Sequence, residues 1–426
     1  MKMEIRNSRY RQYELSNGLV VALQSTPTQT IAAKLRVNYG SVHEREGEEG
    51  IAHFLEHCLV TGGSEEINPV QADEIRSSFG MFNASTNIGR TSFFGLMLRE
   101  DIKKWINYIS NHVFAPRFDC KRVDGERKRV LREIADDKSD FMHSVNLEFN
   151  RLFFRGHPKE MSVLGKEEIV RNADLKEIMT FHLRGYHPNN MDLILVGGLP
   201  KNIEELVEQG FGAQPKGKNT RIEFPLLSPL LKKIILHRSA TERFNTENPE
   251  ESSAQIFLAY LGPVDVHEDR YAVVAMNQVL GGDTSSLLFQ NMGLKKGLAY
   301  QITPFYKGNY NAGVLEIMAN VPAKRLRESI EAIFEEIEKM KSQRVDSKVI
   351  ERIKRIVKYH LAYDCESNGR HVSVINSRLD KKLTPEQFME GWDRVTPLRV
   401  QEVANKYLPN KHNGKYLLYI RDPLQK

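Results

Sequence analysis

Hydrophobic and polar residues follow two periods in the first half of the chain. Residues 31–39 alternate in the way expected of a strand with one buried face, and Asn17-Gly18 divides residues 13–23 into two short strands, because this dipeptide tolerates the positive φ angles of a tight hairpin. Residues 101–114 carry apolar side chains at helical spacing. The same patterns predict helices over 52–60 and 69–79, a long helix that begins near residue 124, and further helices up to residue 182. They also predict strands over 81–86, 93–98 and 193–196.

The second half of the chain repeats this order of elements. The strand before Gly40 corresponds to a strand over 255–261 before Gly262, and the helix before Gly62 to a helix over 271–280 before Gly281. The strand and amphipathic helix over 93–114 likewise correspond to residues 313–340. The separations are 222 residues (40 to 262), 219 (62 to 281) and 221 (Tyr186 to Tyr407). This near-constant spacing favours an internal duplication. It predicts an α+β fold of two homologous units, each an antiparallel-rich sheet packed with helices.

A segment rich in proline, glycine and basic residues separates the two halves. Residues 214–229 contain Pro215, Gly217, Pro225 and Pro229 around a basic tract. Such a composition is typical of a surface linker, although a long loop within one domain is the alternative. We therefore predict a first domain over 1–213, a linker over 214–229 and a second domain over 230–426.

Composition narrows the class of protein. The 426 residues include 61 basic and 55 acidic side chains, a formal charge of +6, with 40% hydrophobic and 27% charged residues. These values are typical of a globular chain with two or three domains. Basic residues are interspersed with acidic ones, so no nucleic-acid partner is expected.

Cysteine usage and the amino terminus bear on location. The three cysteines are far apart and form no C-x-x-C pair, which argues against a disulfide framework or a cysteine zinc site and favours the cytoplasm. The first eleven residues contain five charges and no apolar core, and no run of about 18 apolar residues occurs. Neither an export signal nor a membrane span is predicted.

The pentapeptide His53-Phe-Leu-Glu56-His57 carries the clearest chemical signal. Residues four apart share one face of a helix, so both imidazoles can reach one metal ion while Glu56 lies beside them. Zinc in hydrolases commonly takes two histidines and a carboxylate and keeps a position open for water, whose pKa it lowers. The alternative is a chance grouping of polar residues on a helix surface.

Two further carboxylates share a face of the helix that begins near residue 124. Glu126 and Glu133 lie on one stripe with Val130 and Ile134. A carboxylate among apolar residues is costly unless a metal or hydrogen bonds compensate it, so one of the two is a candidate third ligand. Ordinary surface salt bridges remain the alternative.

These residues resemble the pitrilysin group of zinc metallopeptidases, which includes the mitochondrial processing peptidase. The resemblance covers essentially the whole chain, and its hallmark is H-x-x-E-H followed about 76 residues later by a glutamate, here Glu133, 76 residues after His57. It implies two similar α+β units and one Zn²⁺ per chain, held by His53, His57 and Glu133. It also implies Glu56 as catalytic base and Glu126 as an acidic residue supporting a ligand.

Residues 80–86 resemble the edge strand with which this family binds an extended peptide. In such β-augmentation the main chain holds the peptide and side-chain pockets select it. The resemblance implies that Asn83, Ala84 and Ser85 contact substrate. An ordinary edge strand is the alternative reading of this generic segment.

A second substrate motif is incomplete. Residues 297–300 resemble the family segment whose tyrosine, here Tyr300, orients substrate together with an arginine seven residues earlier. That position is Gly293, and the nearest basic residues are Lys295 and Lys296. Either a lysine substitutes, although it lacks the planar fork of arginine, or a partner chain supplies the arginine. Some family members divide the work in this way between homologous subunits.

The resemblance implies a zinc metalloendopeptidase for short or extended peptides that acts with a homologous partner, as a heterodimer or homodimer. The length and the missing arginine are similar to the zinc-bearing subunit of bacterial heterodimeric members, including peptidases that trim precursors of ribosomally made bacteriocins. Two alternatives stay open. The chain is a catalytically silent scaffold subunit, or a zinc hydrolase of non-peptide amides.

Overall fold

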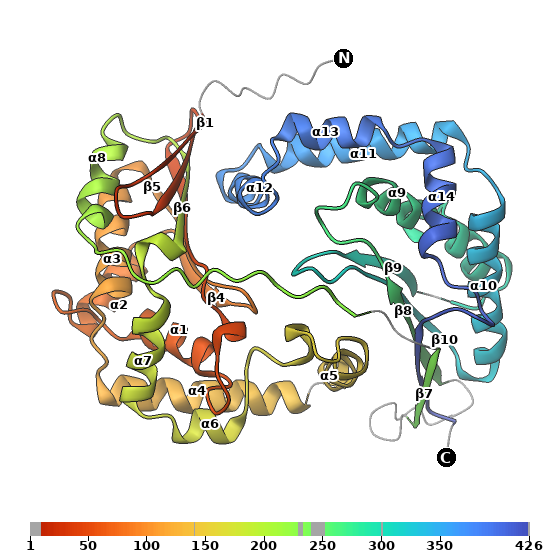
Figure 1. Cartoon of the computed structure of the whole chain (residues 1–426), viewed down its shortest axis with the longest axis horizontal. Helices are drawn as coiled ribbons and strands as arrows, with labels where there is room; N and C mark the ends of the chain where they lie inside the picture. Colours follow the sequence, from red (N-terminus) through yellow and green to blue (C-terminus); the bar gives the residue numbers. More distant parts are fainter. Residues whose placement is uncertain (1–9, 140, 229–232, 240–251, 300, 425–426) are drawn as a thin grey trace. The chain divides into compact units, whose positions relative to one another are not determined.

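The computed structural model describes residues 10–139, 141–228, 233–239, 252–299 and 301–424. The chain divides into two compact units, which Figure 1 shows as separate groups of strands and helices. The first unit comprises Met1–Glu148, Met161–Glu223 and Leu361–Lys382, and the second comprises Phe149–Glu160, Phe224–His360 and Leu383–Lys426. Each unit contains one mixed sheet and several helices, so the predicted α+β class with two similar units is confirmed.

The first unit is built on a six-stranded sheet. Its strands are β1 (Tyr10–Glu14), β2 (Val20–Ser25), β3 (Thr30–Val37), β4 (Met81–Thr86), β5 (Thr91–Leu98) and β6 (Met191–Gly197), in the order β1-β2-β6-β3-β5-β4. Only the β2–β6 pair is parallel. The predicted hairpin joins β1 to β2, and Gly18 at its turn has φ +90°, a conformation that favours glycine.

One face of this sheet is covered by the helices that follow its strands. These are α1 (Ile51–Thr61), α3 (Ile102–Phe114) and α7 (Leu175–Gly185), with α2 (Pro69–Ser77), α4 (Cys120–Ser139), α6 (Glu167–Asn172) and α8 (Ile203–Val207) around them. Alternate strand residues such as Val21 and Leu23 enter the main core with Phe54 and Trp105. The period-2 pattern thus buries one sheet face against the helical stripes.

The other face of the six-stranded sheet is covered by a helix from much later in the chain. Val372 and Ile375 of α12 (Asn368–Lys381) form a separate apolar cluster with Ala22, Ile194 and Val196. Charge also holds this helix, because Arg36 in β3 pairs with Asp380 at 2.6 Å and with Asp192 at 3.1 Å.

The second unit repeats the arrangement with five strands. They are β7 (Ile234–Ser239), β8 (Ser253–Leu261), β9 (Gln301–Lys307), β10 (Val314–Pro322) and β11 (Leu417–Asp422), in the order β7-β11-β8-β10-β9. Only β7–β11 is parallel, as is β2–β6 in the first sheet. The strand order therefore matches that of β2-β6-β3-β5-β4, which agrees with an internal duplication.

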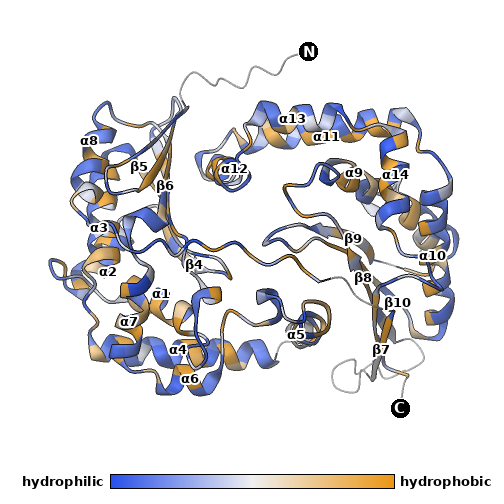
Figure 2. Ribbon diagram, in the orientation of Figure 1, coloured by the Kyte–Doolittle hydropathy of each residue, from blue (hydrophilic) through white to orange (hydrophobic). Residues whose placement is uncertain are grey.

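Helices cover both faces of the second sheet as well. One face carries α9 (Arg270–Gly281), α10 (Leu326–Ser342) and α14 (Pro397–Tyr407), with α11 (Ser347–Asp364) and α13 (Pro385–Asp393) beyond them. The other face carries Phe149 and Phe153 from the end of α5 (Phe141–Phe153), packed with Ala259, Val314 and Leu417. Figure 2 shows apolar positions along both the strands and the helices of each unit.

The two units do not coincide with simple halves of the sequence. Residues 215–228 form neither helix nor strand, and the boundary between Glu223 and Phe224 lies within the predicted linker. However, Leu361–Lys382 belongs to the first unit and Phe149–Glu160 to the second. Each half thus contributes a segment to the other half's sheet, because each sheet has a second apolar face to cover. The domain bounds predicted from the sequence did not include this exchange.

Candidate metal centre

Helix α1 positions the three polar residues of the predicted motif. Glu44 holds its start, since one Glu44 carboxylate oxygen accepts hydrogen bonds from the backbone N–H groups of Gly50 (3.0 Å) and Ala52 (2.8 Å). Phe54 and Leu55 face the apolar core and are fully buried. The predicted i, i+4 spacing then brings His53 and His57 onto adjacent turns of one face.

Helix α4 brings Glu133 to the two imidazoles. The Nε2 atoms of His53 and His57 are 3.2 Å apart, and the Glu133 Oε2 atom lies 3.7 Å from the first and 3.6 Å from the second. Two ligands at about 2.0–2.1 Å from a tetrahedral zinc ion are separated by roughly 3.3 Å. The spacing and donor types of this triangle therefore fit a zinc ion.

The other ring nitrogen of His57 is held by Glu126. His57 Nδ1 lies 2.9 Å from a carboxylate oxygen of Glu126, which is 6% exposed. Burial opposes a charge on His57, but this hydrogen bond and the charges of Glu133 and Glu56 outweigh it and raise the pKa of the imidazole. A carboxylate on the far nitrogen orients a metal-binding histidine, which is the arrangement predicted for Glu126.

His53 differs electrostatically from His57. Burial, with a smaller contribution from the charge of His57, lowers the pKa of His53 to about 4. The neutral imidazole that binds a metal is therefore the stable form of His53 near neutral pH.

Glu56 lies within the same site and is bonded to the edge strand. The Thr86 hydroxyl, at the end of β4, donates a hydrogen bond of 2.7 Å to Glu56 Oε2. Burial raises the pKa of the Glu56 carboxyl, although the bond from Thr86 and the charge of His57 oppose the rise. Thr86 was not singled out in the sequence. The sequence placed Thr86 at the end of a predicted strand, directly after Ser85. It did not predict that the Thr86 side chain faces Glu56, because this depends on the register of β4 against β5.

The predicted substrate strand is an edge strand. β4 pairs only with β5 and lies at the end of the sheet order, and Asn83 and Ser85 are exposed while Ala84 is half-buried. The Asn83 side chain accepts a hydrogen bond of 2.8 Å from the backbone N–H of Ala84. A peptide that took this N–H as its donor would have to displace the asparagine side chain.

The second predicted substrate motif is described only in part, because Tyr300 lies outside the described residues. Gly293 lies in the short helical segment Phe289–Lys295. Lys296 forms an ion pair of 2.6 Å with Glu335, whereas Lys295 is exposed. Of the two lysines, Lys295 is thus the one whose ammonium group is not engaged by Glu335.

The described residues contain no second cluster of this kind. Within the ranges given above, His53, His57 and Glu133 are the only group of three histidine, cysteine or acidic side chains whose ligand atoms all lie within 4.8 Å of one another. The three cysteines are free thiols, and Cys58, next to His57, is buried. No helix among the described residues is both long and apolar enough to cross a membrane.

Comparison with known proteins identifies the class. Residues 20–167 match the family model described as Insulinase (Peptidase family M16), and residues 172–357 match the model described as Peptidase M16 inactive domain. The chain is 28% identical over 408 residues to "Uncharacterized zinc protease YmxG" of Bacillus subtilis, an alignment covering 93% of this chain and 95% of that protein.

Solved structures share the fold over the whole chain. A protease from Helicobacter pylori has a TM-score of 0.83 at 21% identity, covering 97% of this chain and 99% of that one. The periplasmic protease PqqL of Escherichia coli has a TM-score of 0.80 at 18% identity, covering 98% of this chain but only 48% of that one. The chain belongs to peptidase family M16, the pitrilysin family, whose relatives include proteins named zinc proteases.

Proposed function

We propose that this chain is a zinc endopeptidase that cleaves extended peptides at the site on α1 and α4. The observation that carries the proposal is the convergence of His53 Nε2, His57 Nε2 and Glu133 Oε2, with Glu56 one residue from a ligand and anchored by Thr86. One zinc ion per chain would be held by the three ligands. When bound, zinc acts as a Lewis acid toward a carbonyl oxygen and lowers the pKa of water.

Glu56 is the residue that moves the proton. Its Oε1 is free of the Thr86 bond, which engages Oε2 at 2.7 Å, and can accept a proton from the attacking water. The same carboxyl then donates that proton to the leaving amide nitrogen as the C–N bond breaks. The raised pKa of the buried carboxyl favours this two-way transfer, because an acid nearer neutrality holds and releases a proton more readily.

β4 provides the surface along which the peptide extends. Its exposed edge and its position one hydrogen bond away from Glu56 support pairing of a substrate strand with residues 83–85. Main-chain pairing accepts many side chains, so it supports a broad preference for extended peptides.

A homologous partner subunit forms the next part of the proposal. Gly293 stands where the family motif has arginine, and the chain spans 48% of PqqL, so another protein of this fold has about twice the length. We propose a heterodimer in which the partner supplies the arginine and tyrosine, with a homodimer as the alternative.

The proposal extends to substrate and location. The length of the chain and the glycine at position 293 are similar to the zinc-bearing subunit of bacterial heterodimeric members, which include peptidases that trim bacteriocin precursors. The precursor of a ribosomally made bacteriocin is therefore the substrate we propose to test first. Three free cysteines, one of them exposed, support a cytoplasmic location.

A silent scaffold subunit is the second candidate. The description of residues 172–357 as an inactive domain favours it for that part of the chain, most of which lies in the second unit. The four residues His53, Glu56, His57 and Glu133 argue against it for the whole chain, since a scaffold has no need to bring them together.

The variant Glu56→Gln tests the proposal. It keeps the shape and a hydrogen-bond acceptor for Thr86 but cannot take up a proton. Zinc content should stay near one per chain, whereas cleavage of a peptide mixture should fall on the order of 10²–10⁴-fold. Glu351→Gln, at an exposed glutamate of the second unit, is the matched control and should cleave as the unaltered chain does.

Two results would contradict the proposal. Cleavage by Glu56→Gln at the rate of the unaltered chain would remove Glu56 from the mechanism. A zinc-loaded unaltered chain that cuts no peptide, alone or with its homologous partner, would favour the scaffold. Equal hydrolysis of single amides and of long peptides would instead point to a non-peptide amide substrate.

A further inference from the structure

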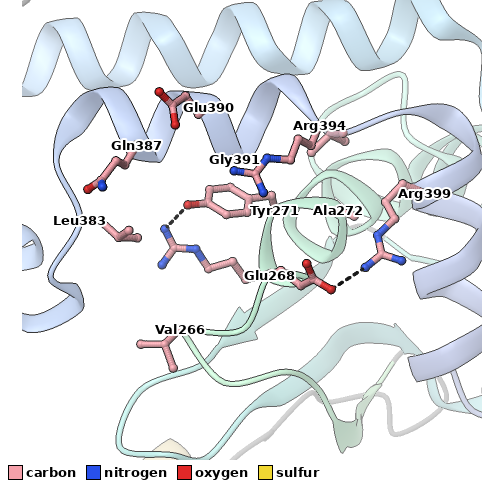
Figure 3. A pocket seen from close by; sticks show the side chains of 12 residues that line it. Val266, Glu268, Tyr271, Ala272, Leu383, Gln387, Glu390, Gly391, Arg394 and Arg399 are labelled. Carbon is pink, nitrogen blue, oxygen red and sulfur yellow. Dashed lines mark hydrogen bonds and ion pairs between the residues drawn. The ribbon is translucent and has the colours of Figure 1, made fainter.

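A cavity of about 520 Å³ lies in the second unit, where nothing described so far assigns a function. It is bounded by the loop before α9, the first turn of α9, the length of α13 and the first turn of α14. Figure 3 shows Tyr271 from α9, with Leu383 and Val266 on the side to which its hydroxyl points. Three of the twelve lining residues are arginines, namely Arg270, Arg394 and Arg399.

Arg270 is a buried cation without a carboxylate partner. Its residue is 5% exposed, and its guanidinium donates only to neutral oxygens, the backbone carbonyl of Asp265 at 2.6 Å and the Tyr271 hydroxyl at 2.9 Å. The second bond is drawn dashed in Figure 3. Among the described residues, no carboxylate lies within ion-pair distance of it. These two bonds use two of the five N–H donors of the group.

Arg399, which lines the same cavity, differs from Arg270 in having carboxylate partners. Arg399 pairs with Glu402 at 3.0 Å and with Glu268 at 3.6 Å, and it also contacts Asp269. Its charge is therefore compensated within the protein. A buried charge without such compensation is costly, so the cation of Arg270 is suited to an anion that enters from the cavity.

Arg394 supplies a second cation at the end of α13. The residue is exposed and lines the same cavity, where Figure 3 labels it at the end of α13. In the parts of the chain with described side chains, its guanidinium has neither a hydrogen bond nor an ion pair, and only its backbone N–H is bonded, to the carbonyl of Trp392. Gly391 leaves room for the ring of Tyr271, because a Cβ there would come within 2.2 Å of it. The Arg270 guanidinium stacks on this ring, with its Cζ atom 4.4 Å from the ring centroid.

The balance of charge indicates the kind of ligand. Glu268 is engaged by Arg399, so Glu390, four residues before Arg394 along α13, is the remaining acidic group among the lining residues. Two cations against one carboxylate leave one positive charge, which a single monoanionic group neutralises. Val266, Leu383 and Val395 add apolar surface for an organic portion.

We propose that this cavity binds a small organic monocarboxylate, with the carboxylate held by Arg270 and Arg394 and its apolar part against Val266, Leu383 and Val395. The planar guanidinium fork matches the two oxygens of a carboxylate. A multiply charged phosphate fits less well, because Glu390 would oppose its additional charge. The proposal does not depend on catalysis at the first unit.

Calorimetric titration of the full-length chain tests the ligand class. N-acetyl-leucine carries the proposed carboxylate and an apolar side chain, and N-acetyl-leucinamide is its neutral counterpart. The acid should bind with one site per chain and about tenfold or more tighter than the amide, equivalent to about 1.4 kcal/mol. Equal binding of both, or binding of inorganic phosphate but not of the acid, would overturn the proposal.

Variants then locate the bound molecule. Arg394→Gln should weaken binding of N-acetyl-leucine about tenfold, since an exposed side chain is removed without disturbing the core. Arg355→Gln, an exposed arginine of α11 outside the cavity, is the control and should bind normally. Unchanged binding by Arg394→Gln, with an unchanged melting temperature, would contradict the assignment.

A longer acid separates two sources of the same chemistry. If the natural ligand is the carboxyl end of a peptide, N-acetyl-Ala-Ala-Leu should bind more tightly than N-acetyl-leucine. If it is a small free acid, the shorter compound should bind at least as well. Either order supports the carboxylate cavity, and loss of binding by both acids in Arg394→Gln ties the result to this site.

Discussion

Helices α1 and α9 occupy the same place in two similar units, but α1 carries polar side chains where α9 carries apolar ones. Applying the 219-residue separation of the glycine pairs places Ala272, Ala275 and Met276 at the positions of His53, Glu56 and His57. All three are at most 2% exposed and belong to the core of the second unit. One duplicated helix therefore carries a candidate metal centre, and the other carries apolar packing.

The difference teaches that the chemistry depends on what surrounds the helix. In the first unit Glu126 and Glu133 come from α4 and Thr86 from β4, so His57 Nδ1, the two imidazole Nε2 atoms and Glu56 Oε2 each lie near a polar group of another element. In the second unit Ala272, Ala275 and Met276 of α9 instead pack within the apolar core. A fold alone therefore does not define a site, which depends on specific residues placed on it.

The largest expected effect comes from removing a ligand in the first unit. His57→Ala takes away one of the three ligands and the histidine that Glu126 contacts, so zinc content should fall from about one per chain to near zero and cleavage should be lost. The melting temperature should become insensitive to added zinc, because a bound metal stabilises by mass action. His412→Ala, an exposed histidine in the second unit, should bind zinc normally. Full zinc content in His57→Ala would break the comparison.

The next largest effect, on the free energy of unfolding, is expected from placing a carboxylate in α9. Ala275 is fully buried, so Ala275→Glu would introduce a charge with no partner and lower the free energy of unfolding by about 3 kcal/mol or more. Glu56→Ala in α1 should cost far less, since it removes a carboxyl whose burial is already unfavourable. Urea unfolding measures both. Equal costs for the two variants would mean that the helices have similar surroundings after all.

Glu126→Gln sharpens the comparison by testing support for a ligand. The amide can still accept from His57 Nδ1 but has no charge to orient and polarise the ring. We expect zinc affinity to fall about 10- to 100-fold, measured by competition with a chelator. Glu168→Gln, at an exposed glutamate of α6, serves as the control. Unaltered affinity would reduce Glu126 to a structural role.

The smallest expected effect concerns the link between the edge strand and Glu56. Thr86→Val removes the hydroxyl that holds Glu56 Oε2, so kcat should fall about tenfold while KM changes little. Thr86→Ser keeps the hydroxyl and should restore most of the rate. A fall in kcat shared equally by both variants would show that the methyl group, and not the hydrogen bond, matters.

The sequence was sufficient for features that depend on local spacing. The period of the helix carrying His53 and His57, and the stripe that aligns Glu126 with Glu133, both follow from helical geometry, and the structure brings these residues together. The order of elements also predicted two α+β units, because repeated landmarks imply repeated topology.

Features that depend on long-range contacts were not predicted. The apolar face of α12, with Val372 and Ile375, fits either sheet in principle, and only the structure places it on β6 and β3. The bond from Thr86 depends on strand register in the same way. The buried cation of Arg270 was also invisible, since the sequence does not reveal that its acceptors are neutral oxygens.

Anomalous diffraction at the zinc absorption edge, on crystals of the zinc-loaded chain, tests the central claim most directly. We expect one strong peak per chain, within bonding distance of His53 Nε2, His57 Nε2 and Glu133. No peak should lie beside Ala272, Ala275 and Met276 of α9. A zinc-loaded chain with no peak at the first site, or with its zinc bound in the second unit, would contradict it.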